Sequence, residues 1–179
     1  TSIDPQMVIW NADSSPPTWD EVTIKGTNLR AVDVRVDLGE DLELDILPKP
    51  VSVTNDKISI KLSSTTPSGL KQVRIIHPLQ IGTPKKLHKG LESNIAFFIL
   101  VPNIISINPL SLVAGSKLVV QFEPALSGDQ KVKVIVGTYK PIQPKTPTSG
   151  SNNIEVTIPK EFEAGTYPLR IRIDGAESQ

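Results

Sequence analysis

The sequence contains no cysteine and only two histidines among its 179 residues. The absence of cysteine excludes disulfide bonds, thiolate nucleophiles and cysteine-ligated metal sites. With two histidines, pairs of a nucleophile and a base are scarce as well. A nucleophilic serine of the G-x-S-x-G type is also absent from the sequence. These absences predict a non-catalytic protein without a cofactor.

Aromatic residues and an excess of charge of one sign are lacking too. Aromatic residues make up 4% of the chain, and basic and acidic residues are equal in number, at 19 each. A surface that binds single-stranded nucleic acid combines positive charge with stacking aromatic side chains. A glycan-binding accessory module would expose a row of Trp or Tyr, and the chain has two of each. No apolar run approaches the ~18 residues of a membrane helix. We therefore expect no nucleic-acid partner and no membrane span.

What the sequence does contain is alternation of apolar and polar residues. The run AVDVRVDL at 31–38 is expected to bury the side chains of Val32, Val34, Val36 and Leu38. The run LELDIL at 42–47 repeats the pattern. Alternation of this kind is typical of strands that bury one face, and no stretch shows a helical period. The pattern predicts an all-β fold with almost no helix.

The chain also repeats itself. Ile58 and Ile154 are 96 residues apart, and the same offset matches Gly69 to Gly165 and Ile75 to Ile171 without an insertion. About seven short strands in each ~90 residues, separated by Gly and Pro turns, are typical of an immunoglobulin-like sandwich. We therefore predict two tandem immunoglobulin-like β-sandwich domains, at 1–101 and 102–179.

The glycines of the repeat mark a corner between two strands. Gly69 and Gly165 are both expected to adopt a positive φ, which a side chain would oppose. Tyr167 stands where many such sandwiches place a tyrosine whose hydroxyl bonds back across the corner, whereas copy one has Lys71 there. Copy one continues into a loop and a closing strand, SNIAFFILV at 93–101. Its counterpart would lie beyond Gln179, so we expect the second domain to lack its last strand.

Two charged segments are candidate contacts with a partner. The first is the basic loop around Lys85, Lys86, His88 and Lys89, which would dock on an acidic surface or a phosphate backbone, unless its charges only keep a hairpin tip soluble. The second is the acidic turn, with Glu40, Asp41 and Glu43. Its acids favour a solvated strand edge over a calcium loop or a pair of catalytic carboxylates.

A metal site would have to use both histidines. His77 and His88 are eleven residues apart and would meet across a hairpin, with Glu92 as a third ligand. Surface histidines beside a turn explain the same residues without a metal. No clustered ligand spacing supports the site, so we predict no bound metal.

Two runs resemble a known family. RIIHPLQIGTPKKLHKGLESNIAFFILVPNI and, about seventy residues later, GTYPLRIRIDGAES are similar to the C-terminal part of the tube-and-sheath terminator (cap) proteins of phage-tail-like contractile injection systems. The likeness is carried by His77, Pro78, Gly82, Pro84, His88, Gly90, Glu92, Ser93, Asn94 and Phe98, and by Gly165, Tyr167, Arg170, Asp174, Gly175 and Glu177. The two runs cover about a quarter of the chain.

The resemblance implies an assembly role. Members of the family form a ring, expected to be hexameric, on the end of the inner tube and the last sheath layer, through an N-terminal domain that this sequence does not include. The immunoglobulin-like region would be an appendage that contacts other cap subunits, tube or sheath proteins. The implied location is the cytoplasm, where the particle assembles, and the exterior after its release. The alternative is a cell-surface or secreted tandem that binds a protein or a carbohydrate.

Overall fold

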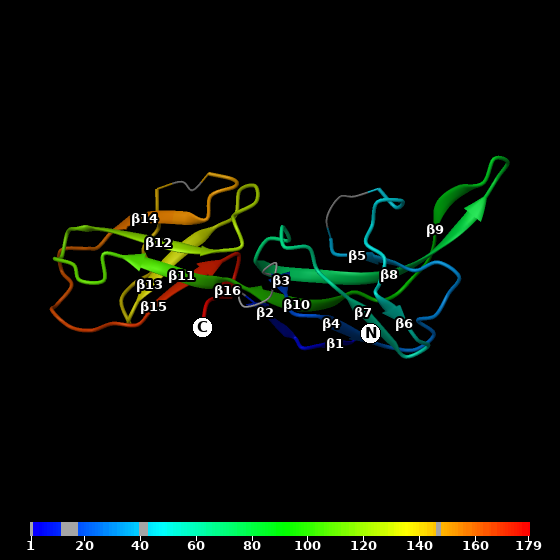
Figure 1. Cartoon of the computed structure of the whole chain (residues 1–179), viewed down its shortest axis with the longest axis horizontal. Coiled ribbons are helices and arrows are strands. Elements are labelled where there is room, and N and C mark those ends of the chain that lie inside the picture. Colours follow the sequence, from blue (N-terminus) through cyan, green and yellow to red (C-terminus); the bar gives the residue numbers. More distant parts are fainter. Residues whose placement is uncertain (1, 12–17, 40–42, 146–147) are drawn as a thin grey trace. The chain divides into compact units, whose positions relative to one another are not determined.

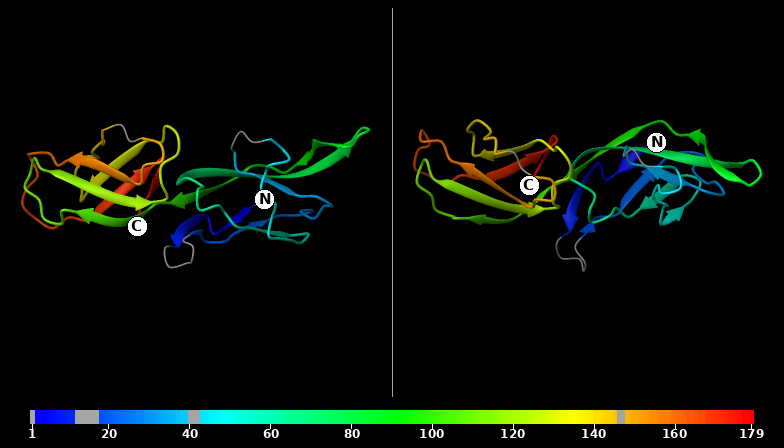
Figure 2. Two further views of the ribbon diagram at one scale, coloured as in Figure 1. Left: turned by 45° about the horizontal axis from the view of Figure 1, so that its top comes forward. Right: turned by 90° about the horizontal axis from the view of Figure 1, so that it is seen from above.

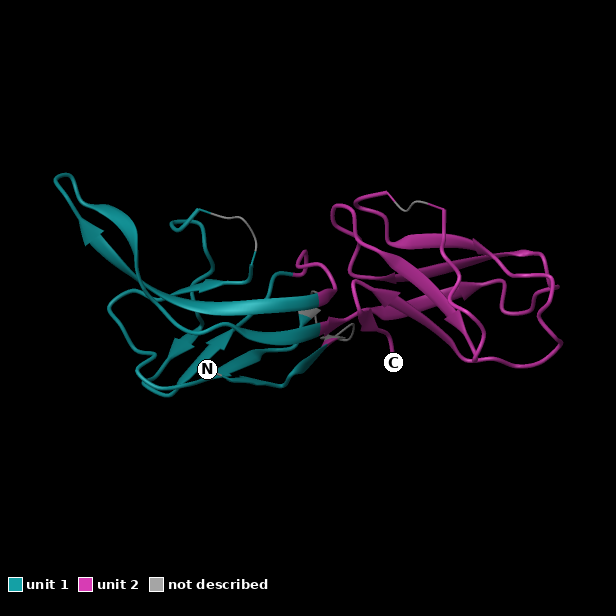
Figure 3. Ribbon diagram, turned by 180° about the vertical axis from the view of Figure 1, so that it is seen from behind, with its two compact units in different colours: residues 1–8, 18–63, 70–99 teal, residues 9–17, 64–69, 100–179 magenta. Residues whose placement is uncertain are grey.

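The chain is all-β and forms two compact units. The computed structural model describes residues 2–11, 18–39, 43–145 and 148–179. Across these ranges it has sixteen strands and no helix, and therefore no helix that would cross a bilayer. Unit 1 comprises residues 1–8, 18–63 and 70–99, and unit 2 comprises residues 9–17, 64–69 and 100–179 (Figure 3). The main division lies between Ile99 and Leu100, where the sequence predicted 101/102.

The first sandwich is made by β1 to β10. One sheet has the order β1-β4-β7-β6 and the other the order β3-β2-β10-β8-β5, with β9 paired to β8 (Figure 1). The strands of the first sheet are β1 (Ser2–Asp4), β4 (Val22–Lys25), β7 (Lys57–Ile60) and β6 (Ser52–Val53). Those of the second are β3 (Thr18–Trp19), β2 (Met7–Asn11), β10 (Ala96–Val101), β8 (Gly69–Ile81), β5 (Arg35–Asp37) and β9 (Lys86–Glu92).

The second sandwich is made by β11 to β16. Its sheets have the orders β11-β12-β14 and β13-β15-β16. Their strands are β11 (Asn103–Asn108), β12 (Lys117–Glu123), β14 (Asn153–Thr157), β13 (Val132–Val136), β15 (Leu169–Ile173) and β16 (Ala176–Glu177).

The strand orders are those of the immunoglobulin fold, in which strands A, B, E and D form one sheet and C, F and G the other. In the first sandwich β1, β4, β7 and β6 take the A, B, E and D positions, and β5, β8 and β10 take C, F and G. In the second, β11, β12 and β14 are A, B and E, and β13, β15 and β16 are C, F and G. The 96-residue offset carries each repeated strand onto its topological equivalent, which confirms the two tandem immunoglobulin-like domains.

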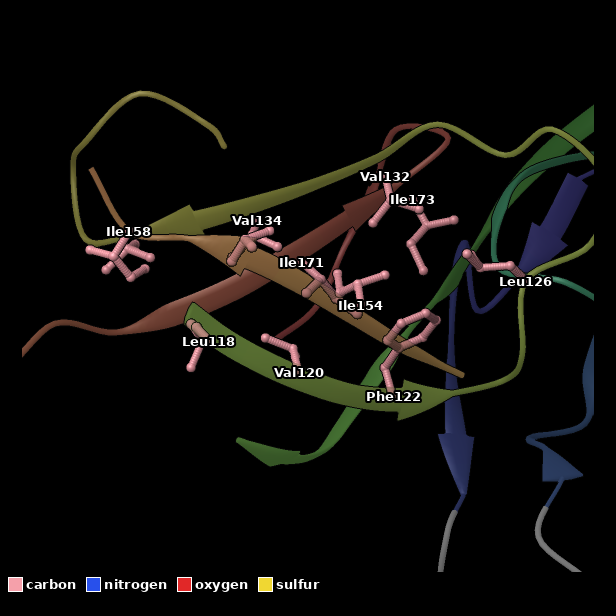
Figure 4. Packing of buried hydrophobic residues seen from close by; sticks show 12 residues of the cluster. Leu118, Val120, Phe122, Leu126, Val132, Val134, Ile154, Ile158, Ile171 and Ile173 are labelled. Carbon is pink, nitrogen blue, oxygen red and sulfur yellow. The ribbon is translucent and has the colours of Figure 1, made fainter. Parts of the chain in front are cut away.

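The predicted alternation builds the core of the second sandwich. Leu118, Val120 and Phe122 of β12 point to one side of their sheet and are at most 3% exposed. They meet residues of the facing sheet, among them Ile171 and Ile173 of β15 (Figure 4). Burying a side chain of this kind contributes about 1.5–3 kcal/mol. The hydrophobic effect therefore fixes which face of each strand turns inward.

Two predictions of buried alternation were wrong in part. In the run 31–38 the side chains of Val34, Val36 and Leu38 are buried, but Val32 is fully exposed, because only Arg35–Asp37 form a strand. In the run 42–47, of which residue 42 lies outside the described ranges, no strand forms. Ile46 is 61% exposed and Leu47 is buried.

Arg35 explains why that second run is not a strand. Alternation with Val34 and Val36 would turn its side chain toward solvent, but that side chain is only 6% exposed. The guanidinium donates from Nη1 to the carbonyl oxygens of Asp45, at 3.0 Å, and Leu47, at 3.3 Å. A buried cation requires such acceptors. The chain at 43–47 is therefore held as a turn whose carbonyls point at Arg35.

The prediction that the second domain lacks its last strand also needs correction. β16 occupies the closing position and pairs with β15 through Arg172↔Glu177 and Ile173↔Ala176. The amide of Ser178 extends the pairing by donating to the carbonyl of Ile171 at 2.9 Å. A short closing strand is therefore present, although the repeat offset has no residues to match it.

Candidate interaction surfaces

The segment predicted as a basic loop is a β-hairpin. β8 runs on past Ile76, the last residue that pairs with β5. It turns at 82–85 and returns as β9, with Leu79 opposite His88 and Ile81 opposite Lys86. We call residues 77–92 the arm, which extends beyond the paired core of its own sheet (Figures 1 and 2). The sequence did not distinguish this hairpin from a loop, because Gly, Pro and Lys dominate its tip.

A bulge sets the register of the arm. The pairing shifts between His77 and Leu79, where Lys89 and Gly90 of β9 together oppose Pro78. A Cβ at Gly90 would lie 2.3 Å from the carbonyl oxygen of His77 and 2.8 Å from Cγ of Leu79. Real Cβ atoms do not approach a backbone oxygen so closely, so the bulge needs glycine at this position.

One face of the arm continues the inner face of β8. Val73 and Ile75 are buried in the sandwich, and in a strand alternate residues share a face. Leu79 and Ile81 continue that row but are 52% and 54% exposed. Leu91, which lies opposite His77 on the same face, is 75% exposed. The arm thus presents a row of apolar side chains of the kind found in a core, and none of the strands described here covers it.

The arm also carries positive charge. Lys85, Lys86, His88 and Lys89 are all exposed. Among the described residues, none of the three lysines is in an ion pair, whereas Glu92 pairs with Arg74 at the base of the arm. The negative charge nearest to the lysines in sequence is therefore already neutralised, and the arm is locally cationic.

The two histidines lie on one face of the arm but have different surroundings. His77 Nε2 is 3.0 Å from the carbonyl oxygen of Leu29, while His88 is exposed opposite Leu79. Glu92, the third ligand considered, is engaged by Arg74. Within the described ranges, no group of three or more His, Asp or Glu residues has the geometry of a metal site.

The acidic turn is described only in part. Glu40 and Asp41 lie outside the described residues. Glu43 is exposed, and its carbonyl oxygen accepts a hydrogen bond from the amide of Ile46 at 3.1 Å. The structure thus leaves the acidic turn as a predicted contact, with only Glu43 located.

The tyrosine corner predicted in the second copy is present. Tyr167 Oη donates to the carbonyl oxygen of Glu163 at 3.1 Å. Tyr139, which no sequence pattern singles out, stacks on Phe162 at a centroid distance of 3.8 Å and meets Tyr167 edge-on at 5.5 Å. Its hydroxyl lies 3.4 Å from that of Tyr167. This hydrogen bond, together with desolvation, raises the pKa of Tyr167.

Only one of the two repeat glycines has the predicted conformation. Gly69 has a φ of +122°, which favours glycine. Gly165 is not in the positive-φ region, so that prediction was wrong. Glycine is favoured at this position because a Cβ would be crowded, at 3.1 Å from both Cζ and Oη of Tyr167. The tyrosine ring covers the corner, and an added Cβ would push it by a few tenths of an ångström.

A pocket of about 750 Å³ opens beside this corner. Its walls come from residues within 107–114 and 162–169, together with core side chains such as Leu118 and Val136. Leu110 and Val113 on its rim are 88% and 76% exposed. No pattern in the sequence indicates this pocket, because its two loops are about fifty residues apart and meet only in the folded sandwich.

Ion pairs join the closing strand β16 of the second sandwich to its neighbour β15. Glu177 of β16 binds two arginines of β15, with Oε1 2.5 Å from Arg170 Nη1 and Oε2 2.5 Å from Arg172 Nη2. Hydrogen bonds from Arg172, then the charges of both arginines, hold the pKa of Glu177 below its ordinary value despite partial desolvation. The unpaired edge that the sequence predicted is therefore covered as far as Ile171.

Comparison with known proteins gives a family-model match for part of the chain. Residues 102–179 match the model of a domain of unknown function, DUF8756. No curated protein matches the chain. Among solved structures, the chain is similar to a chimeric titin Z1Z2 functionalized with a KLER exogenous peptide from decorin. That match has 14% identity and a TM-score of 0.27, and it covers 96% of this chain and 89% of the titin chain. At this TM-score the similarity adds nothing to the fold assignment, which rests on the strand order.

Proposed function

We propose that this chain is a non-catalytic interaction module and that the arm is the surface by which it binds a protein partner. The observation that carries the proposal is the uncovered inner face of the arm. Leu79, Ile81 and Leu91 are each more than half exposed on a face that continues the buried row of β8. Apolar side chains gathered on an exposed face are characteristic of contact surfaces.

The charges of the arm support the same proposal. A hairpin that is only kept soluble by its lysines has no need of three large apolar side chains on one face. Here Lys86 and His88 lie on that face, beside Ile81 and Leu79 across the hairpin. An apolar strip bordered by lysines that make no ion pair with any described residue suits a partner surface with apolar residues and carboxylates, since charge complementarity guides and orients the contact.

The setting that we propose is the cap of a contractile injection system, with this chain as an immunoglobulin-like appendage. The support is the resemblance described above. Seven of the residues that carry it are in the arm: His77, Pro78, Gly82, Pro84, His88, Gly90 and Glu92. The partners are then other cap subunits or tube and sheath proteins. The module would be assembled in the cytoplasm and would leave the cell with the released particle.

Particle assembly tests the proposal. The substitutions Lys85→Glu, Lys86→Glu and Lys89→Glu, made together, reverse the charge of the arm without touching a buried side chain. Contractile particles assembled with the wild-type chain should contain it after purification by sedimentation. Particles assembled with the triple variant should lack it, because carboxylates on both surfaces repel each other.

A matched variant controls for net charge. Lys49, Lys61 and Lys160 are exposed and lie outside the arm, so their triple exchange for Glu should leave incorporation unchanged. Equal incorporation of both triple variants would remove the arm from the interface. A wild-type chain that never sediments with such particles would overturn the cap setting.

A further inference from the structure

We propose that the free edge of β9 binds its partner by strand addition, and that the added strand is an acidic, extended segment. This inference rests on the proposed function, because it specifies how the arm makes its contact. The arm is a ribbon of two strands, so each strand has one edge that is not paired within the hairpin. The two edges differ, and the difference identifies the edge that can accept a strand.

The outer edge of β8 is blocked. The main-chain groups of Ile75 face β9, because its carbonyl accepts from the amide of Ser93 at 2.9 Å and its amide donates to Oγ of Ser93 at 3.0 Å. Main-chain groups alternate in direction along a strand, so those of Pro78 and Gln80 face outward. Proline has no amide hydrogen. Pro78 thus removes a donor from the centre of this edge, which is how natural sheets protect an edge from pairing.

The outer edge of β9 has no such protection. Within the described residues, β9 pairs only with β8, and Lys86–Glu92 contains no proline. His88 and Lys86 lie opposite Leu79 and Ile81, whose main-chain groups face inward by the same alternation. The amide and carbonyl of Leu87, between them, therefore face outward. An added strand would satisfy these groups, as in other complexes formed by strand addition.

The side chains beside this edge define the chemistry of the added strand. Lys86 and His88 flank it on one face, and Leu87 flanks it on the other. A strand with carboxylates on the first face and apolar residues on the second would match both. A second copy of the arm would set lysines beside lysines, which is unfavourable for directly opposed like charges. The lysines therefore select against self-association and in favour of an acidic partner.

A synthetic peptide tests the inference. The probe is an eight-residue peptide of alternating glutamate and valine with blocked ends, and binding to the full chain is measured by titration. We expect binding that weakens with added salt and a slowed hydrogen exchange of the Leu87 amide. The same peptide N-methylated at alternate residues keeps its charges but cannot complete the ladder, so it should bind at least about tenfold more weakly.

Matched proline variants place the contact on one edge. Leu87→Pro removes the outward amide of β9, and Gln80→Pro removes the outward amide of β8. Both should fold, because proline is tolerated where the amide faces solvent at an edge. Cross-strand contacts between β8 and β9 in NMR spectra would check this. Only Leu87→Pro should lose peptide affinity, by at least about tenfold.

The outcomes separate this inference from the proposed function. Failure of the wild-type chain to bind the peptide, or equal binding of the N-methylated peptide, would overturn strand addition. In that case loss of particle incorporation in the triple lysine variant would still support docking by the arm. If the triple lysine variant were incorporated to the same extent as the wild-type chain, the docking proposal itself would be overturned. Self-association of the chain at the β9 edge would overturn the assignment of an acidic partner.

Discussion

Gly90 of β9 lies directly against the carbonyl oxygen of His77 in β8, where an added Cβ would be 2.3 Å away. This contact fixes the bulge that brings Leu91, His88 and Lys86 onto the same face of the arm. The exposed apolar and basic side chains meet on one face because this glycine allows the two strands to approach. The bulge is therefore the structural origin of the proposed contact surface.

Gly90→Ala should open the arm. Insertion of a methyl group into a closely packed site typically costs about 1–3 kcal/mol, and here the strands must separate or slip. We expect faster hydrogen exchange at the Leu79 and His88 amides. The unfolding temperature of the sandwich should change little, because the arm contributes few buried side chains. The neighbouring substitution Lys89→Ala is the control, and its amides should exchange at the wild-type rate. Unchanged amide exchange in Gly90→Ala would contradict the role of the bulge.

Tyr167→Phe should lower the unfolding temperature of the second sandwich by a few degrees. The change removes the hydroxyl that donates to the Glu163 carbonyl, while the ring remains beside Gly165. The hydrogen bond with Tyr139 raises the pKa of Tyr167 above its ordinary value of 10.0, so the neutral hydroxyl is favoured in the folded state. Its stabilising effect is therefore complete below about pH 10 and lost as the pH rises through the raised pKa.

Thermal unfolding of wild-type, Tyr167→Phe and Tyr139→Phe chains at several pH values checks this prediction. Tyr139→Phe should cost less, because both hydrogen bonds of the Tyr139 hydroxyl, with the Tyr167 hydroxyl and with the amide of Glu163, are longer, at 3.4 Å. A difference between wild type and Tyr167→Phe that persists well above pH 10 would show that the hydroxyl proton is not what matters.

Glu177→Gln should lower the stability of the second sandwich at neutral pH, and the size of this loss should depend on pH. The arginines beside Glu177 lower its pKa from the ordinary value of 4.5, so the folded state favours the carboxylate. The wild type should be more stable than the variant above about pH 4.5. This advantage should disappear as the pH falls through the lowered pKa. Unfolding temperatures measured from pH 7 to pH 2 test it, with exposed Glu161→Gln as the control expected to follow the wild type.

Truncation of the two adjacent phenylalanines in β10 should change the free energy of unfolding by very different amounts. Phe98 is 1% exposed and Phe97 is 57% exposed. Phe98→Ala leaves a cavity in the first sandwich and should cost about 3–5 kcal/mol of unfolding free energy. Phe97→Ala should stay within about 0.5 kcal/mol of the wild type. Denaturant unfolding of the two variants measures both. A larger loss in Phe97→Ala than in Phe98→Ala would mean that β10 has the opposite orientation.

Much of the fold could be predicted because its determinants are local. Alternation at Val34 and Val36, or at Leu118 and Val120, assigns a buried face to each strand through the period of two that every strand shares. The 96-residue offset aligned equivalent strands because each copy must bury the same faces. Tyr167 was found in the same way, since the corner bond joins residues only four apart in sequence.

Other features depended on contacts that a local pattern does not contain. Alternation predicted burial of Val32 and a strand at 42–47. Val32 instead lies outside the strand, and in the second segment the carbonyls of Asp45 and Leu47 turn toward Arg35, whose charge also pairs with Asp33. Gly165 was predicted to have a positive φ. In the structure its φ is ordinary, and a side chain there would instead crowd the ring of Tyr167. The pocket beside it joins two loops that come together only in the folded sandwich.

The sequence by itself determined that this chain is a pair of β-sandwiches, because hydrophobic burial on alternate residues leaves little choice of secondary structure. Only the tertiary structure decided that the basic segment after β8 is a paired hairpin with an apolar face and one open edge. The physical reason is that exposure depends on where the opposite sheet ends. Leu79 and Ile81 follow the same alternation as Val73 and Ile75, but no strand in the described part of the chain covers them.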